Sequence, residues 1–158
     1  MGLFRKSAVY FLLALAPCVL ASTAHAEQHN QTIYLAHPDA VDGVTLTDGS
    51  GRTYRLDAVS PPLSQQTCAT EDGASVNCAQ RSRVVLEQFA SSVLTCISLS
   101  QEHASHTVRC RDAMGRDLGA RLVKSGWALP DRATSHRYIF DEMEAEALKQ
   151  GVWRVRAY

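Results

Sequence analysis

Apolar residues in this chain form one long run near the N-terminus and, after it, a series of short segments. Residues 8–20 are almost wholly apolar and follow two basic residues, and Ala24-His25-Ala26 has the small-x-small pattern of a signal-peptidase site. The run is too short to span a bilayer comfortably, and no later apolar run suggests a membrane span. The sequence therefore predicts a signal peptide over residues 1–26 and one mature domain over residues 27–158.

Stretches of alternating or β-favouring residues predict three strands in the first part of the mature chain. They cover residues 31–36, 44–47 and 52–59. Asp48-Gly49-Ser50-Gly51 separates the last two and offers the positive φ angles that a hairpin turn needs. Proline cannot donate a hydrogen bond to a strand ladder, so Pro61-Pro62 is expected to end the third strand.

Helical periodicity begins after a loop rich in Ser, Thr and Gly. It covers residues 80–91, where Val84, Val85 and Phe89 can share one apolar face. The pattern that follows predicts two strands and a short helix, at residues 93–99, 106–111 and 117–124.

The last helix is expected to begin at a cap formed by Thr134 or Ser135 and to run to Gln150. A glycine follows each of the two C-terminal helices, and we expect Gly126 to end the shorter one and Gly151 the longer one. This order of elements predicts an α+β fold, specifically a five-stranded OB-fold barrel with three helices. Periodicity alone leaves the topology open, because an unrelated small α+β domain would show a similar pattern.

Four cysteines remain once the signal peptide leaves, and an even number in an exported chain favours disulfides. Four cysteines can pair in three ways. The pairs Cys68–Cys78 and Cys96–Cys110 are preferred, because each closes a short loop within one local unit. By loop entropy each bridge would stabilise the fold by roughly 3 kcal/mol.

A zinc site is the alternative use of this region. His103, His106 and Cys110 have a spacing that is typical of metal ligands. The same segment fits a turn that enters a strand, which favours the disulfide interpretation.

The signal peptide also affects the charge of the chain. The full sequence has a net charge of 0, and removal of Arg5 and Lys6 leaves the mature chain at −2 with neutral histidines. This value is a poor match to proteins that bind nucleic acids through a strongly basic surface. A local basic groove remains compatible with the composition.

Three segments of the chain stand out as a set. They are Asp42-Gly43 followed by Arg55-Leu56-Asp57-Ala58-Val59-Ser60-Pro61-Pro62-Leu63, then Leu122-Val123-Lys124-Ser125-Gly126-Trp127-Ala128, then Glu144-Ala145-Glu146-Ala147-Leu148-Lys149-Gln150-Gly151-Val152-Trp153. In this order they resemble the landmarks of the staphylococcal-nuclease (thermonuclease-like) family. The resemblance implies an OB-fold nuclease that cuts DNA and RNA with calcium. Trp127 and Trp153 are expected to anchor the core rather than to hold a ligand.

In that family two aspartates hold calcium, a glutamate assists the attacking water, and two arginines bind the phosphate. The resemblance assigns Arg55 to phosphate binding and Asp42 to calcium. A hard cation needs several oxygen ligands, and a phosphate dianion needs fixed positive donors. From the strand pattern alone, Arg55 fits a surface ion pair equally well, and Asp42 fits a turn before a strand.

Several residues that this chemistry requires are missing at the matching positions. Ser60 stands where the second calcium aspartate is expected, and Leu63 stands where the glutamate is expected. Ser105 falls on the position of the second arginine. Asp131 and Thr134 lie where two tyrosines flank the substrate in the family.

Other charged residues could compensate for these losses. Asp57, Glu71 and Asp72 lie close in sequence to the expected cleft and could rebuild a metal site, or could face water. Arg132 and Arg137 could replace part of the missing phosphate binding, or could be solvated charges at a helix entry.

Two functions follow from the resemblance. The first is an exported, catalytically inactive nuclease-like domain that needs no cofactor and binds a protein, glycan or nucleic acid in the periplasm or outside the cell. The second is an active calcium-dependent nuclease with relocated metal ligands. Loss of both a calcium aspartate and the glutamate favours the first, because removal of one positioned electrostatic group already costs about 10²–10³ in rate.

Overall fold

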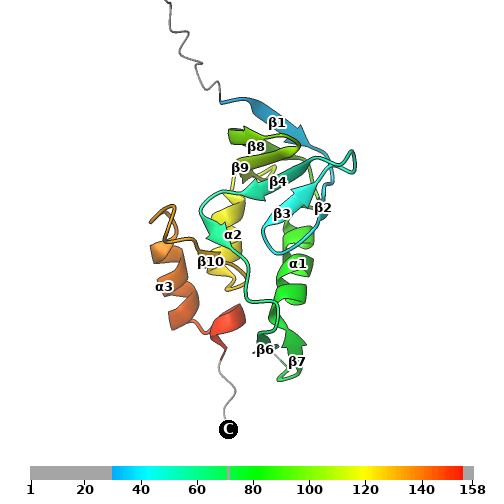
Figure 1. Cartoon of the computed structure of the whole chain (residues 1–158). Coiled ribbons are helices and arrows are strands. Elements are labelled where there is room, and N and C mark those ends of the chain that lie inside the picture. Colours follow the sequence, from blue (N-terminus) through cyan, green and yellow to red (C-terminus); the bar gives the residue numbers. More distant parts are fainter. Residues whose placement is uncertain (1–29, 71, 155–158) are drawn as a thin grey trace, which may run out of the picture.

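The computed structural model describes residues 30–70 and 72–154, and the predicted signal peptide lies outside these residues. Figure 1 shows a curled sheet at one end of the domain, with helices beside and below it. The described residues form an α+β fold with three α-helices, as the sequence predicts. Within those residues no helix has the length and apolar character that crossing a membrane requires.

Six strands form the main sheet. In chain order they are β1 (Thr32–Leu35), β2 (Asp39–Ala40), β3 (Thr45–Thr47), β4 (Thr53–Leu56), β8 (Leu94–Glu102) and β9 (Ser105–Arg111). Their order in the sheet is β1-β8-β9-β4-β3-β2, with β4 and β9 parallel and the other neighbours antiparallel (Figure 1). β1 and β2 lie at opposite ends of this order, yet only residues 36–38 separate them in the chain. The sheet therefore curls back on itself, which is compatible with an OB-like fold.

Two pairs of short strands lie outside the main sheet. β5 (Val59–Ser60) pairs with β10 (Leu129–Pro130), and β6 (Thr67–Ala69) pairs with β7 (Ser75–Asn77). The sequence predicts a single strand over residues 52–59, but the structure divides this segment between β4 and β5. Ala58 adopts a φ of 62° at the break, a left-handed conformation outside the β region. The described residues thus form more strands than the five that the sequence predicts.

The first helix, α1 (Cys78–Phe89), packs beside the curled sheet. Asn77 caps it, because the Asn77 side-chain oxygen accepts a hydrogen bond from the Gln80 amide at 2.9 Å. Val85 and Leu86 enter the core. Val84 is 36% exposed, so the prediction that it shares the buried face is wrong.

The second helix, α2 (Leu118–Lys124), begins at the capping carboxylate of Asp117 and ends where the sequence predicts. Gly126 follows it with a φ of 71°. The Trp127 amide donates to the Leu122 carbonyl at 3.0 Å, and the Gly126 amide donates to the Val123 carbonyl at 2.9 Å. These two bonds form a Schellman motif, which satisfies carbonyls at the end of the helix.

The third helix, α3 (Ile139–Ala147), begins later than the sequence predicts. Thr134 and Ser135 do not cap it, because their amides donate to the Asp131 carbonyl in a separate turn. The helix also ends before Gly151. Lys149 adopts a left-handed φ of 52° after it, and Gly151 instead begins the short 3₁₀ helix η1 (Gly151–Trp153).

Two disulfides, Cys68–Cys78 and Cys96–Cys110, connect the described cysteines in the pairs that loop length favours. The first ties the β6–β7 pair to the start of α1. The second joins β8 to β9, and its two cysteines are 0% and 1% exposed. One bridge therefore constrains a peripheral loop, and the other lies in the core.

The hydrophobic core unites the curled sheet with α1 and α2. Its largest fully buried side chains include Tyr54, Leu46, Leu86, Leu94, Leu118 and Leu122. Because these residues come from both the strands and the helices, the sheet and the helical half of the domain share one core.

Candidate functional site

The segments that the resemblance assigns to a catalytic cleft lie on neighbouring elements. A Cβ atom added at Gly43 would lie 3.4 Å from the Cβ of Pro61 and 2.8 Å from the Cβ of Ser82, so only glycine fits this crossing. Directly after this loop, β3 pairs with β4 and sets Thr45 opposite Arg55. The loop before β3, the centre of β4 and the end of β5 thus belong to one region of the domain.

Arg55 is exposed at the centre of β4. Its neighbours across the sheet are Thr45 on β3 and Thr107 on β9, and both are uncharged. Among the residues that the structure describes, no hydrogen bond or ion pair engages the Arg55 guanidinium. The surface ion pair that the strand pattern allowed is therefore not formed within those residues, and the cation can receive an external anion.

Asp42 is half-buried, and its carboxylate accepts a hydrogen bond from the Val44 amide at 2.7 Å. This contact is an Asx turn that leads the chain into β3. Ser60 is half-buried and Leu63 is 77% exposed, and neither contributes a carboxylate. Calcium takes about six to eight oxygen ligands and prefers several carboxylates among them. One carboxylate in a turn does not fit that ion.

The carboxylates that could rebuild a metal site are engaged elsewhere. Asp57 pairs with Arg109 at 3.0 Å between its Oδ2 and the Arg109 Nη2. Asp72 accepts a hydrogen bond from the Thr70 hydroxyl, which holds the pKa of Asp72 below its ordinary value. Glu71 lies outside the described residues. Within residues 30–70 and 72–154, no group of three or more His, Cys, Asp and Glu side chains could hold a metal ion.

The zinc alternative is wrong, because Cys110 is bonded to Cys96. His106 points into the sheet interior and is only 6% exposed. It stacks on Tyr54 with ring centroids 5.3 Å apart, and its Nδ1 lies 3.3 Å from the Ser98 hydroxyl. The two rings help to line a hollow of about 290 Å³ beside β1.

The loop before α3 does not supply the missing phosphate contacts. Arg132 forms an ion pair with Glu142 on α3. Arg137 lies over the Tyr138 ring, with its guanidinium carbon 5.9 Å from the ring centroid. Asp131 accepts a hydrogen bond from the Ala133 amide within its turn. Arg132 thus stabilises the entry to α3.

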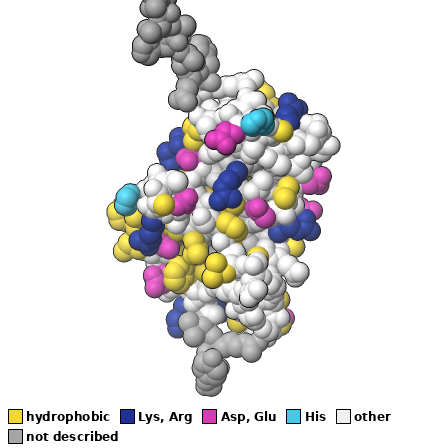
Figure 2. Space-filling view, in the orientation of Figure 1, with side chains coloured by type: hydrophobic (Ala, Val, Ile, Leu, Met, Phe, Trp, Pro, Cys, Tyr) yellow, Lys and Arg dark blue, Asp and Glu magenta, His cyan; other side chains and the backbone are white. Residues whose placement is uncertain are grey.

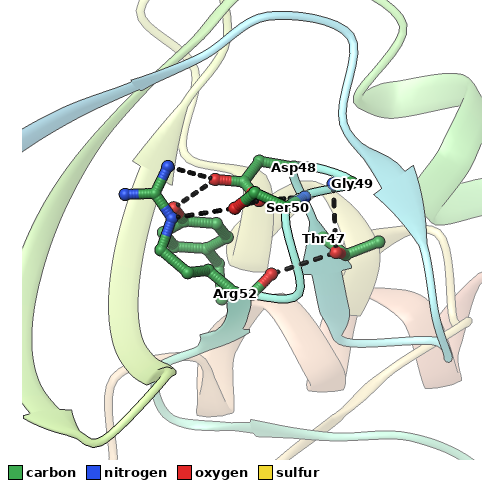
Figure 3. Close-up of polar contacts among 6 residues, drawn as sticks. Thr47, Asp48, Gly49, Ser50 and Arg52 are labelled. Atoms are coloured by element: carbon green, nitrogen blue, oxygen red, sulfur yellow. Dashed lines mark hydrogen bonds and ion pairs between the residues drawn. The ribbon is translucent and has the colours of Figure 1, made fainter.

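A network that sequence reasoning missed surrounds Asp48 in the β3–β4 turn (Figure 3). Its Oδ1 accepts hydrogen bonds from the Ser50 amide and hydroxyl, and its Oδ2 pairs with Arg52 at 2.8 Å. The Tyr54 hydroxyl also donates to Oδ2 at 2.9 Å. These hydrogen bonds, above all that from the Ser50 hydroxyl, hold the pKa of Asp48 far below its ordinary value. The sequence shows only a glycine-rich turn here, because the contact to Tyr54 spans the hairpin.

The surface is mixed in charge. On the face drawn in Figure 2, Lys and Arg side chains lie among Asp and Glu side chains, and the described residues form no continuous basic stripe there. Hydrophobic side chains gather toward the side that α3 occupies, where Phe140 is 82% exposed and Met143 is 58% exposed. The face drawn in Figure 2 thus does not show the broad positive field that non-specific nucleic-acid binding requires.

No protein-family model matches this chain, and no curated protein matches it. The likeness to the nuclease family therefore depends on the residues and the arrangement of elements described above.

Proposed function

We propose that the curled sheet is a nuclease-like OB barrel whose first strand is bent into two halves. β1 and β2 are those halves, and His37, with a left-handed φ of 48°, lies between them. If β1 and β2 are counted as one strand, the main sheet contains five strands. The first and last positions in its order then belong to the same strand, so the sheet closes into a barrel. The parallel pairing of β4 with β9, the exposed Arg55 and the meeting of Gly126 with Gly151 support this assignment.

The protein acts as a binding module and does not hydrolyse its partner. One observation carries this proposal. Where the family holds calcium, this chain places Ser60, the exposed Leu63 and an Asp42 carboxylate that caps its own turn. A site without several anionic oxygens cannot hold a divalent ion beside a phosphodiester or activate water there.

The binding surface is the outer face of β3, β4, β9 and β8 around Arg55. Ser100, Thr107 and Thr45 form a cross-strand row with it, so hydroxyl groups flank one available guanidinium. Such a row favours an anionic group that accepts several hydrogen bonds. OB folds commonly bind their ligands on the equivalent strands. The partner class remains a protein, a glycan or a nucleic acid that carries such a group.

Export to the periplasm or to the outside of the cell completes the proposal. Two disulfides are typical of proteins from oxidising compartments. The apolar run at residues 8–20 and the cleavage pattern at Ala24-His25-Ala26 support the same location.

The alternative is an active calcium-dependent nuclease with relocated ligands. The observation in its favour is Arg55, whose exposed guanidinium has no partner among the described residues, as a phosphate-binding arginine requires. This alternative needs calcium ligands other than the carboxylates of Asp42, Asp57 and Asp72.

Calcium titration of the mature protein by isothermal calorimetry tests the proposal. We expect no saturable heat up to about 1 mM calcium, a range in which weak extracellular calcium sites already fill. Asp39→Asn is the matched control, because Asp39 is an exposed aspartate of β2. Stoichiometric binding that Asp42→Asn removes and Asp39→Asn leaves intact would contradict the proposal.

A further inference from the structure

A hollow of about 450 Å³ is lined by residues of β6, α1 and η1. These elements lie toward the end of the domain away from β1 (Figure 1). Its size is in the usual range for small-molecule pockets, roughly 300–1,000 Å³. Its walls come from four separate parts of the chain. The polar and aromatic lining residues are Thr70, Asp72, Arg81, Trp127, Gln150 and Arg154.

The walls of this pocket are held in place by contacts that do not depend on a ligand. The Cys68–Cys78 bridge fixes the β6–β7 pair to α1, which carries Arg81. On the opposite wall, Gly126 and Gly151 cross so closely that a Cβ at Gly126 would lie 2.2 Å from the Gln150 carbonyl oxygen. The Val152 amide donates to the Gly126 carbonyl at 2.9 Å across the same crossing. The pocket is thus a built feature rather than a gap between loose segments.

Trp127 is only half-buried, so it does not serve the core alone. Trp127 lines the pocket, and the Arg81 guanidinium carbon lies over its ring, 6.0 Å from the centroid. Arg81 is exposed, and within the described residues no carboxylate pairs with it. An arginine held against an aromatic ring presents its N–H edge to ligands and favours a planar carboxylate.

Charge and polarity narrow the class of ligand further. Two of the lining residues are cationic, Arg81 and Arg154, and one is anionic, Asp72. Gln150 and Thr70 add neutral polar groups, so the pocket can both donate hydrogen bonds to a ligand and accept them from it. An apolar ligand would make no hydrogen bond with the side chains of Arg81 and Gln150.

We propose that this pocket binds a sugar acid, meaning a saccharide unit that carries one carboxylate. Arg81 binds the carboxylate, and the Trp127 ring packs against the sugar ring. The Asp72 carboxylate accepts hydrogen bonds from sugar hydroxyl groups, and the Gln150 amide donates hydrogen bonds to them and accepts hydrogen bonds from them. A phosphate ion could occupy the place of the carboxylate at Arg81, but it has no sugar ring to pack against Trp127 and no sugar hydroxyl groups for Asp72 and Gln150. The pocket shares no residue with the surface around Arg55, so this inference stands apart from the proposed function.

Intrinsic fluorescence provides a direct test, because the chain contains only two tryptophans. In the Trp153→Phe protein the signal comes from Trp127, and titration with D-glucuronate should change it saturably. D-Glucose, which lacks the carboxylate, should bind about tenfold more weakly or worse, which corresponds to ~1.4 kcal/mol. Inorganic phosphate should bind more weakly than glucuronate.

Matched variants locate the binding in this pocket. Arg81→Ala should weaken glucuronate binding about tenfold, and Arg81→Lys should have a smaller effect because the charge remains. Arg137→Ala removes another exposed arginine near an aromatic ring and should leave the affinity unchanged. The proposal is overturned by a flat titration up to about 10 mM, by equal binding of phosphate or glucose, or by an Arg81→Ala protein that binds normally.

Glucuronate binding in this pocket should not depend on calcium or on Arg55. Arg55→Ala should leave glucuronate binding intact, whatever it does to a partner on the sheet face. A calcium-binding protein that still binds glucuronate would contradict the proposed function alone, and a calcium-free protein that ignores glucuronate would contradict this inference alone.

Discussion

Two glycines, Gly126 and Gly151, set the packing at the C-terminal end of the domain. Both have positive φ, and each would drive a Cβ atom to within 2.3 Å of backbone on the other segment. The two segments that contain them, one ending α2 and one forming η1, can cross only because neither has a side chain at the contact. The physical reason for both glycines is therefore the same backbone crossing.

Gly126→Ala should destabilise the protein by at least about 2 kcal/mol, because the left-handed backbone penalises a Cβ and the crossing leaves no room for one. Gly49→Ala is the control. Gly49 has a φ of 77° but no atom within 4 Å of an added Cβ, so only the backbone cost of roughly 1–2 kcal/mol remains. Urea unfolding measures both. Equal losses for the two variants would show that the crossing carries no energy of its own.

Asp48 gives the fold a pH-dependent contribution. Because its pKa is lowered in the folded protein, the contribution is present above its ordinary pKa of 3.8 and is lost as the pH falls below that value. Asp48→Asn should therefore lower the urea midpoint at neutral pH, and its difference from the wild type should shrink in acid. Asp39→Asn, at an exposed aspartate, should show little difference at either pH. A deficit in Asp48→Asn that persists unchanged in acid would contradict the assigned network.

At the scale of elements, periodicity predicts the cores of the strands and helices better than their ends. α1 and α2 form where apolar spacing and capping residues agree. The strand expected over residues 52–59 divides because Ala58 turns left-handed, a choice that no local pattern signals. α3 begins later than predicted because the amides of Thr134 and Ser135 donate hydrogen bonds to the Asp131 carbonyl in a separate turn. Pairs such as β5 with β10 are missed because they join residues far apart in sequence.

The Cys68–Cys78 bridge joins the β6–β7 pair to α1 and so holds one wall of the pocket at Trp127. Its removal should therefore affect both the stability of the fold and the binding of ligand in the pocket. Replacement of both cysteines by serine should reduce the free energy of unfolding by about 3 kcal/mol. The same change should weaken glucuronate binding more than it affects partner binding that depends on Arg55, because the β6–β7 wall loses its anchor. Thiol titration of the denatured mature protein checks the premise. Four reactive thiols without reductant would contradict it.

At the scale of the whole molecule, the sequence motifs could place Arg55, Asp42 and Ser60 on neighbouring elements but could not reveal their partners. The Val44 amide that engages Asp42 and the Arg109 that engages Asp57 become visible only when the strands pair. The pocket at Trp127 was equally hidden, since four distant segments form it. The order of elements predicts the α+β class, whereas the partners of a charged side chain depend on which distant donors the fold brings to it.

The near-neutral charge and the mixed surface agree with a module that recognises one group on its partner rather than a long polyanion. The module that we propose presents two separate binding regions, the sheet face at Arg55 and the pocket at Trp127.

DNA digestion by the purified mature protein, with calcium and with a chelator, tests the account's central claim most directly. The account predicts intact DNA under both conditions, because the carboxylates for calcium are missing at Ser60 and Leu63. Digestion that requires calcium and disappears in the Arg55→Ala protein would contradict it, since a contaminating nuclease would not respond to that substitution.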